Sequence, residues 1–167
     1  MMISLNLALK ALEVIVFDYG RTLFDRESNQ FFPDAQSVLT ELSKNYRLAI
    51  VSYSKPSEVA ERIQLLKEAG LYDLFSSIVF TDQPEKKHTE YHNFARSASV
   101  EPNQMAIVDD HLIRGVLWGY RNSSITFWFK NGKFSDVVPS EEVGLPTYTI
   151  STLTEIIEIL DGCRQNV

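Results

Sequence analysis

The stretch VIVFDYGRTLFD, residues 14 to 25, decides the fold of this chain. An apolar run ends at Asp18 and continues into a short turn that is followed by Thr22 and Leu23. A continuous apolar run bounded by turn residues is typical of a strand whose two faces are both covered. We therefore predict a strand over residues 13–18 that fixes the position of the Asp18 carboxylate at its carboxyl end.

Short apolar runs alternate with longer amphipathic segments along the rest of the chain. The predicted strands cover residues 13–18, 47–52, 77–81, 105–109 and 124–129, with a weaker one at 147–150. The predicted helices cover residues 34–43, 56–69, 89–98, a short segment after Asp110, and 153–160. Residues 24–33 and 132–146 are expected to be irregular. The alternation predicts an α/β fold, a three-layer doubly wound parallel sheet of the Rossmann-like type.

Length and composition limit the domain organisation and the partners. A chain of 167 residues with 44% hydrophobic content can bury one sizeable core, so we expect a single domain over residues 1–167. The net charge of −6 and the lack of a long basic cluster argue against binding to nucleic acid or to a membrane surface. A phosphorylated small molecule or a phosphoprotein remains as the expected partner, and the oligomeric state stays open.

The N-terminus and the only cysteine bear on the compartment. Residues 1–14 have no basic leader, and Lys10 and Glu13 interrupt their apolar pattern, so we expect neither a signal peptide nor a membrane anchor. Leucines in this segment fit an extra helical turn or a strand. Cys163 is the single cysteine and cannot form an internal disulfide, which favours a reducing cytoplasm.

Chemically reactive side chains follow several of the predicted strands. Asp18 ends the first strand, Ser52 the second, and the pair Asp109 and Asp110 the fourth, while Lys86 and Lys87 follow the third. In an open parallel sheet, the carboxyl ends of the strands meet at the edge where ligands bind. A carboxylate nucleophile, a hydroxyl, an ammonium and further carboxylates are the groups that phosphoryl transfer with magnesium requires.

Taken in order, four motifs resemble those of the haloacid dehalogenase-like superfamily. They are VIVFDYGRTLFD, LAIVSYS, KHTEYHNF and MAIVDDH, and together they extend over most of the chain. The resemblance implies a hydrolase, most similar to the magnesium-dependent phosphatases of this superfamily, which work through an aspartyl-phosphate. Each motif alone is weak, but four in order at strand ends form a specific pattern.

The resemblance also implies a role for each matching residue. Asp18 would be the nucleophile and a magnesium ligand, and Ser52 the hydroxyl that binds phosphate. Asp110 would hold Mg2+, with Asp109 as a second candidate ligand and Gly20 supplying a backbone carbonyl. The expected substrate-binding residues are Arg21, Tyr53 and Lys86.

Two adjacent lysines compete for the third motif. The spacing from Lys87 to the fourth motif matches the branch of the superfamily that lacks a cap domain, so Lys87 is preferred as the catalytic lysine and Lys86 stays the alternative. The segments from Asp18 to Ser52 and from Ser52 to Lys86 are each too short for an inserted cap. We therefore expect an open site without a sizeable cap domain, partly covered by Phe31, Phe32 and Pro33 unless these residues only pack.

The chain departs from the family pattern at three positions. The second aspartate, which normally acts as the general acid and base, is replaced by Gly20, and the usual glycine after it by Arg21. Arg114 stands four residues beyond Asp110, where Asp or Asn is common. Either both arginines point outward, or one of them pairs with Asp18 or Asp110 and partly replaces the cation.

Three functions remain open from the sequence. The first is a magnesium-dependent phosphohydrolase with weak or unusual proton transfer, because general acid-base catalysis contributes about 100-fold to 10,000-fold. The second is a catalytically impaired module that binds phosphate or protein. The third is a dehalogenase, whose halide leaving group needs no proton.

Overall fold

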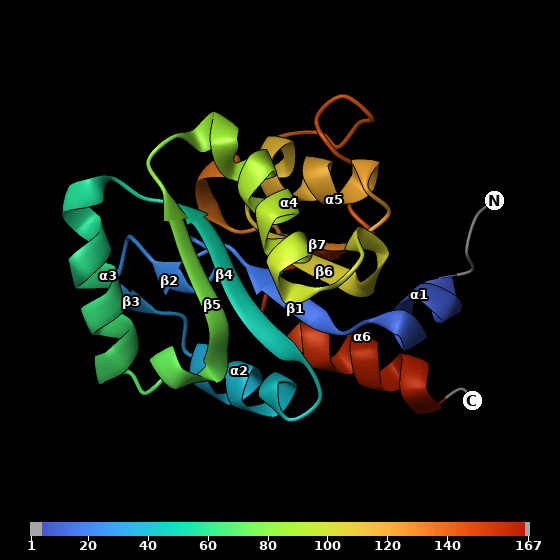
Figure 1. Cartoon of the computed structure of the whole chain (residues 1–167), viewed down its shortest axis with the longest axis horizontal. Coiled ribbons are helices and arrows are strands. Elements are labelled where there is room, and N and C mark those ends of the chain that lie inside the picture. The colour runs from blue at the N-terminus through green and yellow to red at the C-terminus, as the bar shows by residue number, and fades with distance from the viewer. Residues whose placement is uncertain (1–4, 166–167) are drawn as a thin grey trace.

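The protein is built on one six-stranded sheet in the order β5-β4-β1-β6-β7-β8 (Figure 1). The computed structural model describes residues 5–165, apart from the side chains of Lys86, Arg164 and Gln165. The strands of this sheet are β1 (Val14–Phe17), β4 (Arg47–Tyr53), β5 (Phe75–Thr81), β6 (Met105–Asp109), β7 (Ile125–Phe129) and β8 (Tyr148–Ile150). Every neighbouring pair is parallel, so the predicted doubly wound sheet is confirmed.

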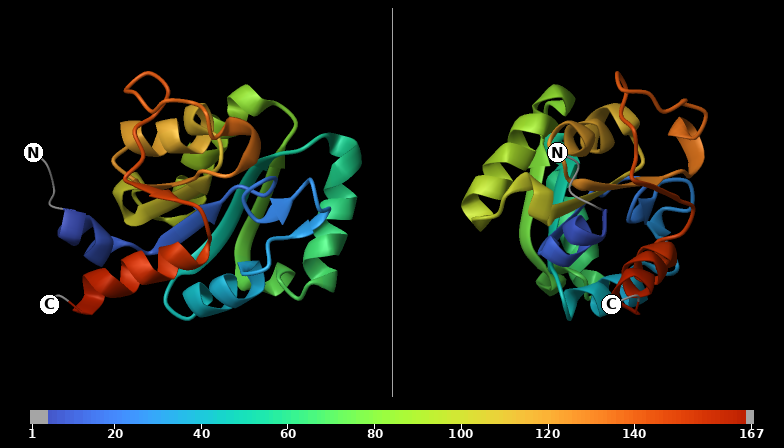
Figure 2. Two further views of the ribbon diagram at one scale, coloured as in Figure 1. Left: turned by 180° about the vertical axis from the view of Figure 1, so that it is seen from behind. Right: turned by 90° about the vertical axis from the view of Figure 1, so that its right-hand side faces the viewer.

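Helices cover both faces of the sheet and make the three layers. They are α1 (Leu5–Ala11), α2 (Ala35–Ser43), α3 (Pro56–Glu68), α4 (Lys87–Ala98), α5 (Leu117–Arg121) and α6 (Thr154–Gln165). Figure 2 shows α4 and α5 on one side of the sheet and α6 on the other. The strands alternate between the two cores. Ile15 and Phe17 face the core that includes α2 and α6, whereas Val14 and Val16 pack with Tyr91 of α4 and Trp118 of α5.

Three segments outside the predicted main strands and long helices are defined by the structure. The segment expected to be irregular over 24–33 contains an antiparallel hairpin of β2 (Phe24–Asp25) and β3 (Gln30–Phe31), here called the flap hairpin. The short helix expected after Asp110 is a π-helix, Leu112–Val116, followed by α5. The N-terminal leucines form a helix rather than a strand. No described helix has the length and hydropathy of a membrane span.

The neighbours β1 and β6 form the switch point of the sheet. Their register aligns Phe17 with Val108, and the backbone N–H of Asp18 donates to the carbonyl of Val108 at 2.9 Å. Chain connections leave this point in opposite directions, so the carboxyl ends of β1 and β6 open onto a crevice. Asp18, Asp109 and Asp110 therefore meet at the position where α/β proteins of this kind bind ligands.

The turn after β1 is closed by one backbone carbonyl. The Tyr19 carbonyl accepts hydrogen bonds from the N–H groups of Leu23 at 3.0 Å and Phe24 at 2.9 Å. Arg21 has a φ of 63°, in the left-handed region that glycine adopts most easily. The turn thus keeps the geometry of a glycine although an arginine occupies the position.

Two glycines allow a matched test of the packing behind the site. A Cβ on Gly119 would lie 2.4 Å from the Thr126 side chain, whereas a Cβ on Gly162 in α6 would meet nothing within 4 Å. We expect Gly119→Ala to destabilise the protein by about 1–3 kcal/mol through overpacking. Gly162→Ala should stabilise it by about 0.5–1 kcal/mol, because alanine has the higher helix propensity. Urea unfolding of both variants measures the difference, and equal effects would contradict this packing.

Candidate active site

A buried lysine joins the ends of three elements. Lys87, the first residue of α4, places its Nζ 2.7 Å from Asp18 Oδ1 after β1 and 2.7 Å from Asp109 Oδ2 at the end of β6. The Lys87 side chain has no exposure to solvent, and those of Asp18 and Asp109 are 9% and 1% exposed. A buried charge is tolerated only when it is paired, so the triad fixes the three groups relative to one another.

Burial and charge act in opposite directions on these groups. Burial alone would lower the pKa of Lys87, but the carboxylates of Asp109 and Asp18 raise it well above its usual range. Lys87 is therefore an ammonium throughout the physiological range and cannot serve as a base. Burial raises the pKa of Asp18. The adjacent Lys87 ammonium and the Ser52 hydroxyl lower this pKa, but the effect of burial is larger.

Asp109 uses both of its oxygens within the protein. Oδ2 accepts from Lys87 and from the Gly115 N–H at 3.0 Å, and Oδ1 accepts from the His111 N–H at 2.9 Å. Gly115 is required for this approach, because a Cβ there would lie 2.5 Å from Asp109 Oδ2. Asp109 thus holds Lys87 and the start of the π-helix in place.

Asp110 differs from its neighbour because its Oδ2 is buried without a hydrogen-bond partner. Its backbone carbonyl accepts from Trp128 Nε1 at 3.1 Å, which fixes the residue at the end of the strand. Burial, together with the charges of Asp18 and Asp109, raises the pKa of Asp110 to about 9. An ionised Asp110 therefore requires a cation that the protein side chains do not supply.

The carboxylates form a group that suits a metal ion. Single oxygens of Asp18, Asp109 and Asp110 all lie within 4.8 Å of one another and are buried. Hard divalent cations prefer such oxygen ligands. Because Asp109 already accepts three hydrogen bonds, the unpartnered oxygen of Asp110 and the neighbouring Asp18 are the groups that best fit an added cation.

The carboxylates open into a small pocket of about 160 Å3. Ser52 and Tyr53, at the end of β4, lie in its wall with Gly20 and Asp110. Ser52 is almost completely buried, its hydroxyl donates to the Tyr53 carbonyl at 3.3 Å, and a hydrogen bond from this side chain acts to lower the pKa of Asp18. Of the residues expected from the sequence to form the site, Asp18, Ser52 and Asp110 thus lie around one cavity.

Arg21 and Arg114 lie in the wall of the same pocket but pair with neither Asp18 nor Asp110. Arg114 is placed over the ring of Tyr53 at 5.7 Å, and Arg21 over the ring of Phe134 at 5.9 Å. Among the described residues, Lys87 alone forms an ion pair with Asp18. The side chain of Lys86 lies outside the described part of the structure, so its expected role in substrate binding is left as a prediction.

The space beside Gly20 is occupied by a guanidinium. A Cβ built on Gly20 would lie 3.2 Å from Arg26 Nε, and Arg26 belongs to the turn of the flap hairpin. Arg26 is held from the other side by Glu58, at 3.7 Å. The position at which the family pattern has an aspartate is therefore bordered by a guanidinium.

The loop between β7 and β8, residues 130–147, forms one side of the pocket and was not predicted from the sequence to do so. Lys133 and Phe134 from this loop line the cavity. Phe134 packs on His111, with ring centroids 4.1 Å apart, and burial followed by the charge of Arg114 lowers the pKa of His111 to about 4. The available signal was the position of a long irregular segment directly after a strand end.

Phe31 and Phe32, which were expected to cover part of the site or only to pack, pack on Tyr19 and on Phe129, respectively.

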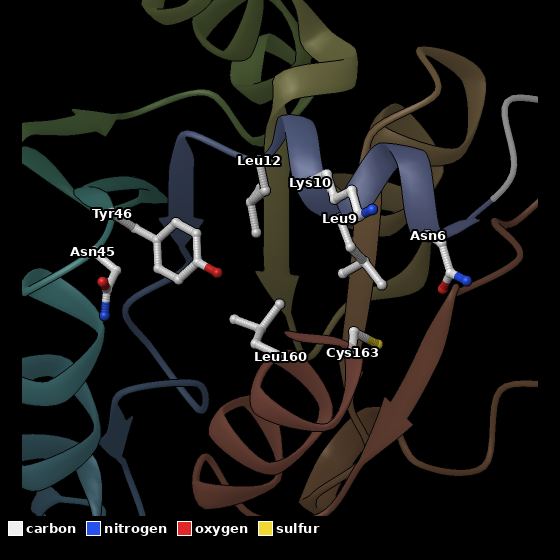
Figure 3. Close-up of a pocket in the computed structure, with 8 residues that line it drawn as sticks. All are labelled: Asn6, Leu9, Lys10, Leu12, Asn45, Tyr46, Leu160 and Cys163. Carbon is white, nitrogen blue, oxygen red and sulfur yellow. The ribbon is translucent and has the colours of Figure 1, made fainter. Parts of the chain in front are cut away.

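A larger cavity of about 370 Å3 lies at the opposite edge of the sheet, between α1 and α6. Figure 3 shows residues that line it, among them Leu9, Leu12 and Leu160, together with Lys10 and Cys163. The residues that line it include no carboxylate, unlike those of the pocket that contains Asp18 and Asp110.

Comparison with known proteins agrees with this geometry. The family model described as haloacid dehalogenase-like hydrolase matches residues 4–122. A comparison with curated protein sequences finds no significant match.

Solved structures share the fold at low sequence identity. An uncharacterised protein from Listeria monocytogenes has a TM-score of 0.70 and 17% identity, over 92% of this chain and 99% of that one. A Bacillus subtilis protein described as a HAD-hydrolase, bound to magnesium, has a TM-score of 0.63 and 24% identity, over 79% of this chain and 57% of that one. The L-2-haloacid dehalogenase of Xanthobacter autotrophicus has a TM-score of 0.71 and 14% identity, over 90% and 99%. These identities establish the fold alone.

The two adjacent aspartates should respond in opposite ways to the same substitution. Asp109→Asn weakens one arm of a buried ion triad, so we expect a loss of about 3 kcal/mol in the free energy of unfolding. Asp110→Asn removes an unpartnered buried carboxyl from beside two others and should raise the stability of the metal-free protein by about 1 kcal/mol. Urea unfolding in EDTA measures both, and a destabilised Asp110→Asn protein would contradict the assignment.

Proposed function

Because the chain belongs to the haloacid dehalogenase-like hydrolase family, we propose that it is a magnesium-dependent phosphohydrolase that acts through an aspartyl-phosphate on Asp18. The observation that carries the proposal is the unpartnered Oδ2 of Asp110 beside Asp18, in a pocket rimmed by basic side chains. Phosphate chemistry needs both features, since the phosphate brings negative charge to a nucleophile that is itself negative.

Magnesium fits the residues that are present. Asp18 and Asp110 would hold the ion through carboxylate oxygens, with the backbone carbonyl of Gly20 as the further ligand that the family pattern implies. When bound, Mg2+ supplies charge neutralisation for the nucleophile and for the oxygens of the transferred phosphoryl group. The same cation would satisfy the buried oxygen of Asp110.

Lys87 orients the nucleophile. It holds Asp18 Oδ1, so Oδ2 is the oxygen left to attack phosphorus. The attack forms the bond between Asp18 and phosphorus while the bond from phosphorus to the leaving oxygen breaks. The Ser52 hydroxyl, buried beside Asp18, donates to an oxygen of the transferred group. Water then attacks phosphorus and releases phosphate from Asp18.

Proton transfer is the weak part of this site. Gly20 has no side chain that could protonate a leaving alkoxide, and Arg26, which borders its place, does not give up its proton at neutral pH. Substrates with weakly basic leaving groups should therefore react best, because their departure needs no acid.

A second candidate function is a phosphate-binding or protein-binding module without turnover. Gly20 favours it, because the loss of the acid is the change expected in a protein that has stopped catalysing. Against it stands the retention of Asp18, Ser52, Lys87 and Asp110 around one pocket. A dehalogenase shares the nucleophile but has no use for the unpartnered oxygen of Asp110.

The partner and the compartment of the protein complete the proposal. A phosphorylated small molecule or a phosphoprotein is the proposed partner, because the pocket opens at the surface without a large cap. The single cysteine fits the reducing cytoplasm as the compartment of the protein.

Replacement of the nucleophile tests the proposal. We expect Asp18→Asn to lower Mg2+-dependent phosphate release from para-nitrophenyl phosphate and acetyl phosphate by at least about 1,000-fold, since the attacking oxygen is lost. Asp161→Asn, at an exposed position of α6, is the matched control and should keep the activity. Release that persists in Asp18→Asn would exclude this nucleophile, and binding of phosphate without any release would favour the module.

Restoring the acid tests the role of Gly20. In Gly20→Asp, the neighbouring Arg26 should hold the new carboxylate ionised, so we expect little gain from the single change. The double variant Gly20→Asp with Arg26→Ala should raise turnover of glycerol phosphate about tenfold, equivalent to roughly 1.4 kcal/mol of barrier.

The control carries Gly20→Asn with Arg26→Ala and has no ionisable group at position 20. Equal rates in the Asp and Asn double variants would mean that proton transfer has another source. A rate that depends on pH only in the Asp variant would support the assignment.

A further inference from the structure

Four basic side chains surround the mouth of the pocket, although the protein as a whole is acidic. They are Arg21, Arg26, Lys133 and Arg114. They come from the turn after β1, the flap hairpin, the β7–β8 loop and the π-helix, so separate parts of the chain converge on one rim. Because the whole chain has a net charge of −6, this cluster of positive charge is specific to the pocket.

Three of these cations have no carboxylate partner. Arg26 pairs with Glu58 at 3.7 Å. The side chains of Arg21, Arg114 and Lys133 instead lie over aromatic rings, at 5.9, 5.7 and 5.4 Å from the centroids, and no ion pair to them occurs within the described residues. Their charge is therefore available to a bound anion.

One phosphoryl group does not account for all of this charge. Asp18 and Asp110 line the floor of the pocket, and the buried side chains of Asp109 and Lys87 complete a group of three carboxylates and one ammonium, which has two negative charges in excess when all three carboxylates are ionised. A divalent cation would offset these two charges. The transferred phosphoryl group would bind at this floor, which leaves the cations of the rim for a second anionic group.

Arg26 supplies independent information about the leaving group. Its Nε lies 3.2 Å from the point where a side chain at position 20 would begin. A guanidinium there cannot donate a proton, but it can stabilise an oxygen that departs with a negative charge. The geometry suits a leaving group that is itself an anion.

We propose that the substrate is a phosphoanhydride, in which the leaving group is a second phosphate held by Arg21, Arg114, Lys133 and Arg26. This inference rests on the proposed phosphohydrolase function and adds the class of substrate to it. A phosphate leaving group meets both conditions at once, because it is polyanionic and needs no proton to depart. The pocket of about 160 Å3 receives the anhydride end, and any larger substituent extends into solvent.

The bonds and protons balance without a protein acid. An oxygen of Asp18 attacks the terminal phosphorus, the bond from that phosphorus to the bridging oxygen breaks, and its electron pair stays on the departing phosphate. Water then attacks the phosphorus of the aspartyl-phosphate, and the bond from phosphorus to Asp18 breaks. Both protons of the water leave with the released phosphate, and Asp18 returns as a carboxylate.

Steady-state kinetics of the full chain with Mg2+ test the inference. We expect kcat/KM for inorganic pyrophosphate to exceed that for para-nitrophenyl phosphate by at least about tenfold, since the aryl compound has a good leaving group but only one phosphate. Arg114→Ala and Arg21→Ala should reduce this ratio at least about fivefold. Arg121→Ala, an exposed arginine of α5 outside the pocket, is the matched control and should leave the ratio unchanged.

Binding to Asp18→Asn separates recognition from turnover. Calorimetry should show methylenediphosphonate, which cannot be hydrolysed, binding at least about tenfold tighter than methylphosphonate, with the difference lost in a second variant that adds Arg114→Ala. Hydrolysis of the aryl phosphate without preference for pyrophosphate, and equal binding of the two phosphonates, would overturn the inference and keep the phosphohydrolase. Failure to hydrolyse either substrate would overturn both.

Discussion

The ammonium of Lys87 lies between the carboxylates of Asp18 and Asp109, and the arrangement of the site depends on this buried triad. Each contact is 2.7 Å long, and the ammonium is closed off from water. Removing charges from water is costly, so none of the three groups is stable at this position without the others. The triad therefore fixes the first residue of α4 against the ends of β1 and β6.

The sheet could be predicted because its strands are apolar on both faces. Short runs such as AIV before Ser52 and AIV before Asp109 alternate with amphipathic segments, which is typical of a covered parallel sheet, and the carboxyl ends of such strands meet at one edge. The flap hairpin was missed because each of its strands is only two residues long, which is too short for an alternating pattern.

The different roles of Asp109 and Asp110 could not be predicted. Successive residues at a strand end point in opposite directions, but the sequence does not say which direction holds the partners. Besides Lys87, Asp109 accepts from the backbone N–H of His111 and from that of Gly115, which lies in a π-helix, a form that local propensity does not indicate, and the approach depends on Gly115. The side chains around the mouth of the pocket could not be predicted for a similar reason. Arg26 is placed by Glu58, and Phe134 is placed by His111, through contacts between segments that are distant in the chain.

The exchange of an acid for a guanidinium changes what the site can favour. An acid beside the leaving oxygen helps most when that oxygen is strongly basic, and its help depends on its protonation state. Arg26 is charged at every accessible pH, so its effect is electrostatic and grows with the negative charge that the leaving group carries away. Gly20 gives the substrate access to that charge, and the unpaired cations of the rim extend it. The departure from the family pattern at position 20 and the basic rim are then two parts of one adaptation to an anionic leaving group.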